Sequence, residues 1–166
     1  AYLSLRGRLG TFAERTHIAL SYQNQHERRR DSRPAGAVEN GGRDDVHSFG
    51  LLARLESAPW TLADGVEFGL GYGGDLYHDR VESVAWTRFT DSGQLLFDTR
   101  GQYLDGSHYT WAGAYVQPKL SLLDGRLILR GGARLAFSAA RAAADEASAT
   151  VGVDQGWLTV VSHGGV

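Results

Sequence analysis

The sequence predicts an all-β fold, an antiparallel transmembrane β-barrel of which this chain supplies a part. Two observations carry the prediction: apolar and polar residues alternate over many stretches, and the connections between these stretches are by turns short and long. A period of two places every second side chain on one face of a strand, and a wholly apolar face suits a wall between lipid and water. The 166-residue chain is 42% hydrophobic but has no run of about twenty apolar residues, which excludes a transmembrane helix and allows strands of about ten.

The clearest alternation follows the turn at residue 125. One face would carry Leu127, Leu129, Gly131, Ala133, Leu135 and Phe137, and the other Arg126, Ile128, Arg130, Gly132, Arg134 and Ala136. Three arginines thus share one face while the other has no charge, a segregation that an amphipathic helix does not give. With six further stretches we expect seven strands, at 3–9, 18–22, 49–55, 66–72, 109–120, 127–137 and 156–165.

The connections support a barrel with two different ends. Tight connections are expected at 12–16, 61–65 and 123–125, and the last two contain the Asp-Gly pair of hairpin turns. Long polar connections are expected at 28–46, 74–108 and 138–155, with 80–89 continuing as strand and 139–149 forming a short helix or a strand extension. Bacterial barrels have short periplasmic turns and long outside loops, so the tight turns should face the cell interior.

Composition excludes several functions. The 17 basic and 19 acidic residues give a net charge of −2, which offers no electrostatic case for nucleic-acid binding. Without cysteine there are no disulfides and no thiolate metal sites. We expect residues 1–166 to be a partial barrel domain without a signal peptide. Because bacterial single-chain barrels close with an even number of strands, seven strands leave two edges unpaired, and the isolated piece should be unstable.

Several segments carry a resemblance to one family. The segment 99–117 has an Arg-Gly, an Asp-Gly-Ser and a tyrosine that lead from an outside loop into a strand ending near Gln117. Residues 66–83 (with Tyr-His-Asp-Arg-Val-Glu-Ser at the end), 125–137 (with Gly-Gly-Ala-Arg-Leu) and 156–166 are similar to the same family. The chain from about Phe49 onward resembles the middle barrel of TonB-dependent outer-membrane receptors.

The resemblance implies a receptor in the bacterial outer membrane that takes up a scarce nutrient, such as an iron-siderophore chelate, haem or cobalamin. Such receptors have twenty-two strands around an amino-terminal plug, and the plug carries the box that TonB binds; neither plug nor box is recognisable here. The implied partners are outer-membrane lipid, the TonB complex through the plug, and a small iron chelate or haem, with no resident cofactor. Within the family, the loop-to-strand segment resembles haem and haemoglobin receptors most.

Side-chain direction suggests two sets of site residues. Charges on the lumen face would meet a plug or water, because an arginine or lysine facing lipid near the midplane costs about 2 to 4 kcal/mol. This set is Arg54, Glu56, Glu67, Arg126, Arg130 and Arg134. The second set could bind an iron chelate from the outside loops, since imidazole and phenolate are haem-iron ligands; the alternative is rim histidines and interfacial aromatics. It comprises Tyr77, His78, His108 and Tyr109.

The tryptophans and the enzyme hypothesis need separate treatment. Trp60, Trp86, Trp111 and Trp157 are expected as girdle or packing residues. No nucleophile elbow, phosphate loop or dinucleotide fingerprint is present, and sequence neighbours such as Ser107 and His108 would point to opposite faces of a strand. We expect no enzyme activity. Two alternatives stay open: a structural, adhesive or translocator barrel without energy coupling, and a soluble β-sandwich or lipocalin-like binder with its apolar faces inward.

Overall fold

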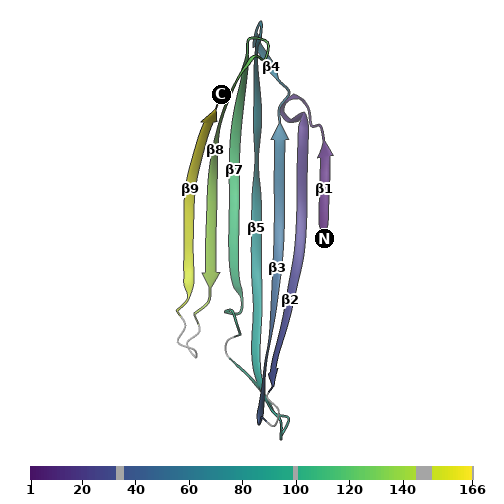
Figure 1. Ribbon diagram of the computed structural model, residues 1–166, viewed down its shortest axis with the longest axis vertical. Coiled ribbons are helices and arrows are strands. Elements are labelled where there is room, and N and C mark those ends of the chain that lie inside the picture. The colour runs from purple at the N-terminus through teal and green to yellow at the C-terminus, as the bar shows by residue number, and fades with distance from the viewer. Residues whose placement is uncertain (33–35, 99–100, 145–150, 166) are drawn as a thin grey trace.

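The computed structural model describes residues 1–32, 36–98, 101–144 and 151–165. This part is one antiparallel sheet in a single layer with a short 3-10 turn, η1 (Thr11–Ala13) (Figure 1). The strands are β1 (Tyr2–Gly7), β2 (Arg15–Ser32), β3 (Val38–Glu56), β4 (Trp60–Ala63), β5 (Val66–Phe89), β6 (Leu95–Phe97), β7 (Ser107–Leu122), β8 (Leu127–Ala142) and β9 (Val153–Gly165). Seven strands follow the order β1-β2-β3-β5-β7-β8-β9, while β4 and β6 are short and pair with β5. The predicted all-β fold and its seven main strands are confirmed.

The strand register gives the sheet two chemically distinct faces. Residues directly opposite each other in an antiparallel pair share a face, so each row of partners can be followed across the sheet. One such row is entirely apolar and runs through Leu3, Leu20, Leu51, Leu76, Ala112, Phe137 and Leu158. We call the side that carries this row the apolar face and the other side the polar face.

The apolar face contains a broad band without Asp, Glu, Lys or Arg. On β5 this uncharged band runs from Val66 to His78, and Arg80 is the first charge beyond it. At about 3.3 Å per residue this is roughly 40 Å of strand, which a tilt of about 45° reduces to ~28 Å. The hydrophobic band of outer-membrane barrels is about 25 Å tall, so the uncharged band has the height that a membrane requires.

The band is open to its surroundings. Leu135 is 47% exposed and Leu158 66%, and among the described residues no large side chain is fully buried. A soluble sandwich or lipocalin would enclose Leu127, Leu129 and Leu135 in a core, but these three are 37%, 37% and 47% exposed. Because a soluble monomer rarely leaves so wide an apolar surface uncovered, the soluble binder is not supported.

Aromatic side chains lie at both borders of the uncharged band. At the border with the short turns, Trp60 packs between Phe12 and Phe68, with ring centroids 5.8 and 5.6 Å away. At the opposite border, Tyr22 and Phe49 lie 4.9 Å apart by ring centroid. Aromatic girdles of this kind mark the two interfaces of membrane barrels. Trp60 thus packs with other aromatic rings at one border of the uncharged band.

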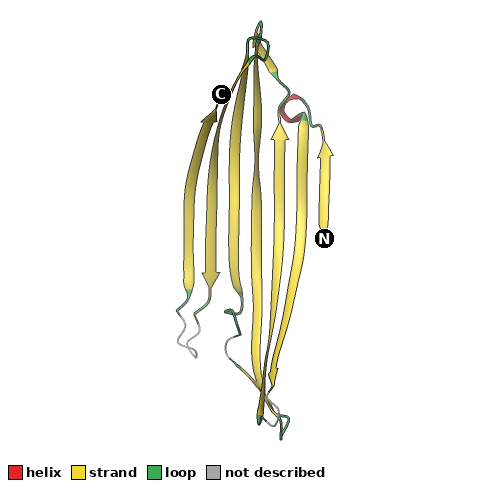
Figure 2. Ribbon diagram, in the orientation of Figure 1, coloured by secondary structure: helices red, strands yellow, loops and turns green. Residues whose placement is uncertain are grey.

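The connections lie at the two ends of the sheet (Figure 2), but their lengths follow the predicted alternation only in part. The β7–β8 turn is tight and the β5–β7 connection, residues 90–106 with β6 inside it, is long, as predicted. The β2–β3 connection, predicted long, comprises only residues 33–37 and is shorter than the 8–14 connection between β1 and β2. In the β7–β8 turn, Leu123 and Asp124 have φ of 54° and 55°, and Gly125 has φ of 85°. In the β4–β5 turn Gly65 has φ of 68°. These left-handed conformations match the twist of the flanking strands, which explains the Asp-Gly pairs.

The long connections are shorter than the sequence predicts, and this is a correction. β2 continues to Ser32 and β3 begins at Val38, so most of 28–46 is strand. β5 runs to Phe89 and β8 to Ala142; the rest of 139–149 lies partly outside the described residues. In these extensions, pairs of polar side chains on neighbouring strands stabilise the sheet, and no apolar face is needed. Such pairs cannot be recognised from the alternation of apolar and polar residues along the sequence. No helix in the described part of the chain is long and apolar enough to span a membrane.

Gly73 lies where β3 and β5 leave no room for a side chain. A Cβ placed on Gly73 would lie 2.1 Å from the backbone oxygen of Ala53, whereas a Cβ on Gly69, on the same face of the same strand, meets nothing within 4 Å. We expect Gly73→Ala to lower the free energy of unfolding by about 1 to 3 kcal/mol because the strands must shift apart. Gly69→Ala should be neutral or stabilising by up to about 1 kcal/mol. Urea unfolding of the full-length protein in micelles checks both, and equal losses would contradict the packing.

Candidate functional site

The polar face carries the charges of the sheet's central region. The predicted lumen residues Arg54, Glu56, Glu67, Arg130 and Arg134 all lie on it, and Arg126 lies in the turn before β8. On this face charged, aromatic and small residues are mixed, in contrast to the uncharged band behind them. All five strand residues thus share the face opposite the uncharged band.

A partly buried ion pair joins β5 to β8 across β7. The Arg134 guanidinium donates a 2.6 Å hydrogen bond to Asp75 Oδ1 and lies 5.1 Å from the centre of the Trp111 ring. Between them is Gly113, where a Cβ would lie 2.3 Å from Arg134 Nη2, so only glycine lets the arginine cross the strand. The Asp75 side chain is 8% exposed, and its Oδ2 has no hydrogen-bond partner among the described residues. Trp111 packs on this pair, so it is a polar-face residue and not a girdle residue.

Three aromatic rings lie next to this ion pair on the same face. Tyr77 and Trp111 face each other across β5 and β7 with ring centroids 5.8 Å apart, and Tyr109 lies one row further along. Gly50 leaves room for the Tyr77 ring, which a Cβ there would approach to 2.9 Å. These rings, with Asp79, line a hollow of about 940 Å³. We call Tyr77, Tyr109 and Trp111 the aromatic platform.

The four predicted ligand residues separate into two pairs. Tyr77 and Tyr109 belong to the aromatic platform, but His78 and His108 lie on the apolar face, because they are their sequence neighbours on the same strands. His78 Nδ1 is 2.9 Å from Thr110 Oγ1, and the rings of the two histidines are 5.9 Å apart by centroid. All four lie on strands and not in loops. One ligand on the polar face can therefore contact the two tyrosines but not the two histidines.

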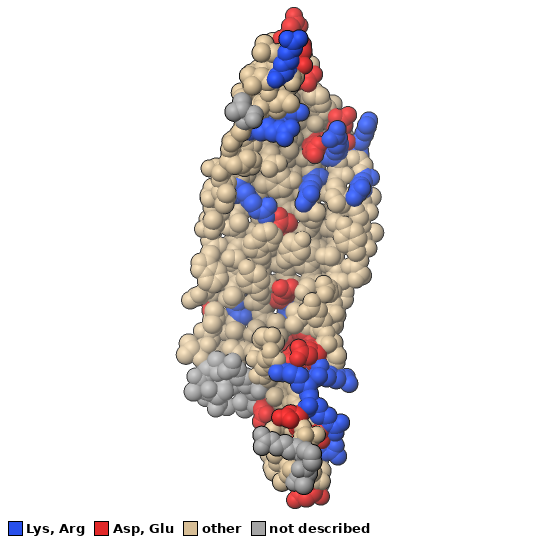
Figure 3. Space-filling view, in the orientation of Figure 1, with Lys and Arg blue, Asp and Glu red and all other residues tan. Residues whose placement is uncertain are grey.

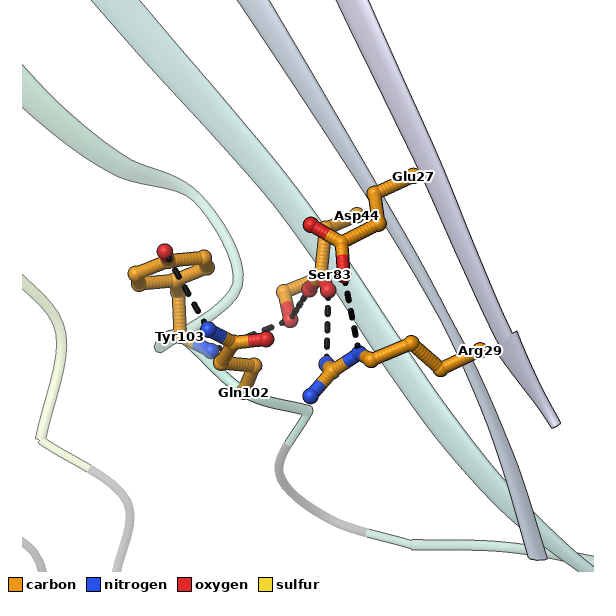
Figure 4. A network of polar contacts seen from close by, with 6 residues as sticks. All are labelled: Glu27, Arg29, Asp44, Ser83, Gln102 and Tyr103. Carbon is orange, nitrogen blue, oxygen red and sulfur yellow. Dashed lines mark hydrogen bonds and ion pairs between the residues drawn. The ribbon is translucent and has the colours of Figure 1, made fainter. Parts of the chain in front are cut away.

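A second polar cluster ties a loop to the sheet at the long-connection end (Figure 4). Asp44 on β3 is 4% exposed in its side chain; Arg29 donates to it at 2.7 Å and the Ser83 hydroxyl at 2.5 Å. The Tyr103 backbone N–H donates in turn to the Ser83 hydroxyl at 3.2 Å, and Asp105 Oδ1 accepts from the Ser83 backbone N–H at 3.0 Å. We call these five residues the loop clamp.

The loop clamp gives a physical role to the segment that carries the family resemblance. Gly101 lies against β5 so closely that a Cβ there would be 2.1 Å from Ser83 Oγ. Gly106 has φ of 71°, and its N–H donates to the Val81 carbonyl at 3.0 Å. The Ser107 hydroxyl donates to the Leu104 carbonyl at 2.6 Å. The Gly and Asp-Gly-Ser elements thus hold the loop onto β5 where β7 begins.

Histidines that look isolated in the sequence have partners in the structure. His26 Nδ1 lies 2.5 Å from Asp45 Oδ1, beyond the uncharged band. This hydrogen bond, with the positive charge of nearby Arg43, holds the pKa of Asp45 below its usual value against the opposing effect of burial. His17 Nε2 lies 3.0 Å from Ser4 Oγ, a cross-strand contact that spacing alone does not reveal. Among the described residues, no three His, Cys, Asp or Glu side chains gather as a metal site would require.

Comparisons with known proteins give little beyond the sheet itself. No protein-family model matches the chain, and no curated protein matches it. Among solved structures it is similar to a double mutant of the Serratia marcescens hemophore receptor HasR in complex with its hemophore HasA and heme. The TM-score is 0.46 and the sequence identity 13%; the match covers 99% of this chain and 29% of that receptor. The chain therefore spans less than a third of the receptor's length.

Proposed function

We propose that this chain is part of the wall of a bacterial outer-membrane β-barrel, in a TonB-dependent receptor that takes up a scarce nutrient. The observation that carries the proposal is the uncharged band: exposed apolar side chains on a single-layer sheet, with the height of a bilayer's hydrocarbon region. Hydrocarbon requires every backbone group to be paired within the protein. The inner strands of the antiparallel sheet meet this requirement, and the edge strands β1 and β9 would pair with further strands of a closed barrel. The chain would then contribute wall and outer extensions, while energy coupling would come from a plug and TonB.

The ligand we propose is an iron-siderophore chelate or haem that contacts the aromatic platform. Phenol oxygens suit iron chemistry and aromatic rings suit a planar ligand, and Tyr77 and Tyr109 are 44% and 42% exposed on the hollowed side. We propose no catalytic role. Neighbours such as His78 and Asp79 lie on opposite faces, and the contact between Ser4 and His17 has no carboxylate hydrogen-bonded to the histidine among the described residues.

Growth on a single iron source tests the ligand. A strain that lacks the gene should fail to grow on haem, or on one ferric siderophore, as the sole iron source, and the full-length gene should restore growth. The variant with Tyr77→Ala and Tyr109→Ala should bind the same compound about tenfold more weakly, while His78→Ala with His108→Ala, on the opposite face, should bind normally. Unchanged growth of the deletion strain on all these sources would exclude iron uptake and favour a structural or adhesive barrel.

A further inference from the structure

A hollow rich in arginine lies on the apolar-face side of the strand extensions, beyond the uncharged band. Its volume is about 550 Å³, and Arg29 and Gly42 are among its lining residues. The side chains that line it from the apolar-face side are Arg28, Arg30, Arg43, Trp86 and Arg88, with Leu95 and Phe97 around β6. We call this set the arginine hollow. Figure 3 shows basic and acidic side chains close together at this end of the molecule, below a middle zone with few charges.

The arginine hollow has more positive than negative charge. Arg28 on β2 lies directly opposite Arg43 on β3, and like charges placed directly opposite in a sheet destabilise it. Arg43 pairs with Asp45 at 2.9 Å and Arg30 with Glu39, but Arg28 and Arg88 have no ion pair among the described residues. On the apolar-face side four arginines thus line the hollow, and two of them pair with carboxylates beside it, of which Asp45 is shared with His26. Glu82, opposite Asp45, pairs with Arg80 instead. An anion bound between the arginines would remove this repulsion.

The floor of the hollow is flat and aromatic. The Trp86 indole lies across Gly41, where a Cβ would be 2.1 Å from its ring, and Phe97 is the next residue in the same row. An indole face packs well against the apolar face of a sugar ring, while guanidinium groups bind phosphate through two parallel hydrogen bonds. The arrangement therefore fits a ligand that has both a saccharide and phosphate groups.

The position of the hollow indicates where such a ligand would come from. Arg43 lies opposite Val84, which is six residues beyond His78, the last residue of the uncharged band on β5. Six residues correspond to roughly 20 Å of strand, so with a tilt of about 45° Arg43 lies about 14 Å above the band. The headgroup zone of a phospholipid bilayer is only about 5 to 8 Å thick on each side. A phosphate at the height of Arg28 and Arg43 must therefore be carried on a longer, saccharide headgroup.

We propose that the arginine hollow binds phosphate groups on the saccharide headgroup of a membrane glycolipid in the leaflet that surrounds the barrel. This inference rests on the proposed function, since it needs the uncharged band to lie in a bilayer. Bound glycolipid would neutralise Arg28 and Arg88 and stack a sugar on Trp86. The bound glycolipid would then hold the extended ends of β2, β3 and β5 against the membrane surface.

The test uses the full-length protein in bilayers that contain lipopolysaccharide as the phosphorylated glycolipid. Bound glycolipid is measured on the purified protein by native mass spectrometry, with insertion into the bilayer measured separately by flotation. The double variant Arg28→Gln with Arg43→Gln, and the single variant Trp86→Ala, should each retain at least about tenfold less glycolipid than the parent. The matched control, Arg6→Gln with Arg8→Gln at the other end of the sheet, removes the same charge and should retain the parent level.

Three outcomes would overturn the proposal while leaving the proposed function intact. The first is that the double variant retains as much glycolipid as the parent, and the second is that the parent retains enzymatically dephosphorylated lipopolysaccharide as well as the phosphorylated form. The third is that a soluble sugar phosphate binds as tightly as the glycolipid, which would mean a site for a free anion. Failure of the parent to float with the vesicles would instead contradict the proposed function. Protease resistance of each variant shows that its sheet has folded, so a loss of glycolipid is not a loss of fold.

Discussion

Val160→Arg should prevent or severely weaken assembly of the full-length protein in a bilayer. Val160 lies on β9 opposite Leu135, within the uncharged band and close to its middle, and it is 68% exposed. If hydrocarbon covers this face, the guanidinium loses its hydration and finds no partner, at a cost of about 2 to 4 kcal/mol near the midplane. Urea unfolding of the protein in lipid vesicles measures this cost directly.

The neighbouring residue supplies the control. Val161 is the same residue type and is 55% exposed, but it lies opposite Arg134 on the polar face. Val161→Arg places a second cation beside Arg134, which costs only about 0.2 to 1 kcal/mol in a solvated setting. Equal losses for the two variants would mean that the two faces meet the same environment, and the membrane assignment would be abandoned.

Asp44→Ala should release the loop at 101–106 and lower the free energy of unfolding by about 1 to 3 kcal/mol. The substitution leaves the buried Ser83 hydroxyl without its acceptor and Arg29 without its closest carboxylate. Because Arg29 is 46% exposed, water compensates part of its loss, and the effect stays below the cost of leaving a fully buried charge unpaired. Limited proteolysis at the loop, with unfolding measured in parallel, checks both effects.

Asp44→Asn separates the hydrogen bond from the charge. The amide oxygen can still accept from Ser83, while the ion pair with Arg29 is lost. We expect Asp44→Asn to keep the loop resistant to protease and to cost less stability than Asp44→Ala. A loop cleaved equally fast in both variants would show that the charge, and not the hydrogen bond to Ser83, holds it in place.

The sequence alone is sufficient for the central parts of the seven main strands and for the direction of most side chains. A period of two is a direct consequence of strand geometry, so the face of Arg130 or Arg134 follows from counting along the chain. The same counting separates Tyr77 from His78, since neighbours on one strand point to opposite faces. The prediction that Tyr77, His78, His108 and Tyr109 share one ligand site assumes that they lie in outside loops, where side chains do not alternate between faces. These residues lie on strands instead, and the strands place the tyrosines and the histidines on opposite faces.

The strand extensions and the polar clusters could not be predicted in the same way. Residues 28–32 and 38–46 are mostly polar on both faces, and pairing between positions far apart, such as Arg29 with Asp44, keeps them extended. The Asp75–Arg134 pair joins β5 to β8 across β7, and its geometry depends on the absence of a side chain at Gly113. A pattern read along one strand contains no information about register, and register brings these groups together.

The extension of β2, β3 and β5 beyond the ends of the other strands has a consequence for encounters with molecules from outside (Figure 1). A disordered loop must lose conformational freedom when something binds it, at about 1 to 2 kcal/mol for each backbone residue fixed. Here the hydrogen-bonded ladder has already fixed the backbone at residues such as Arg28 and Trp86 during folding. An antibody, phage protein or ligand that arrives from solution would therefore meet a preformed shape and bind it with little entropic penalty.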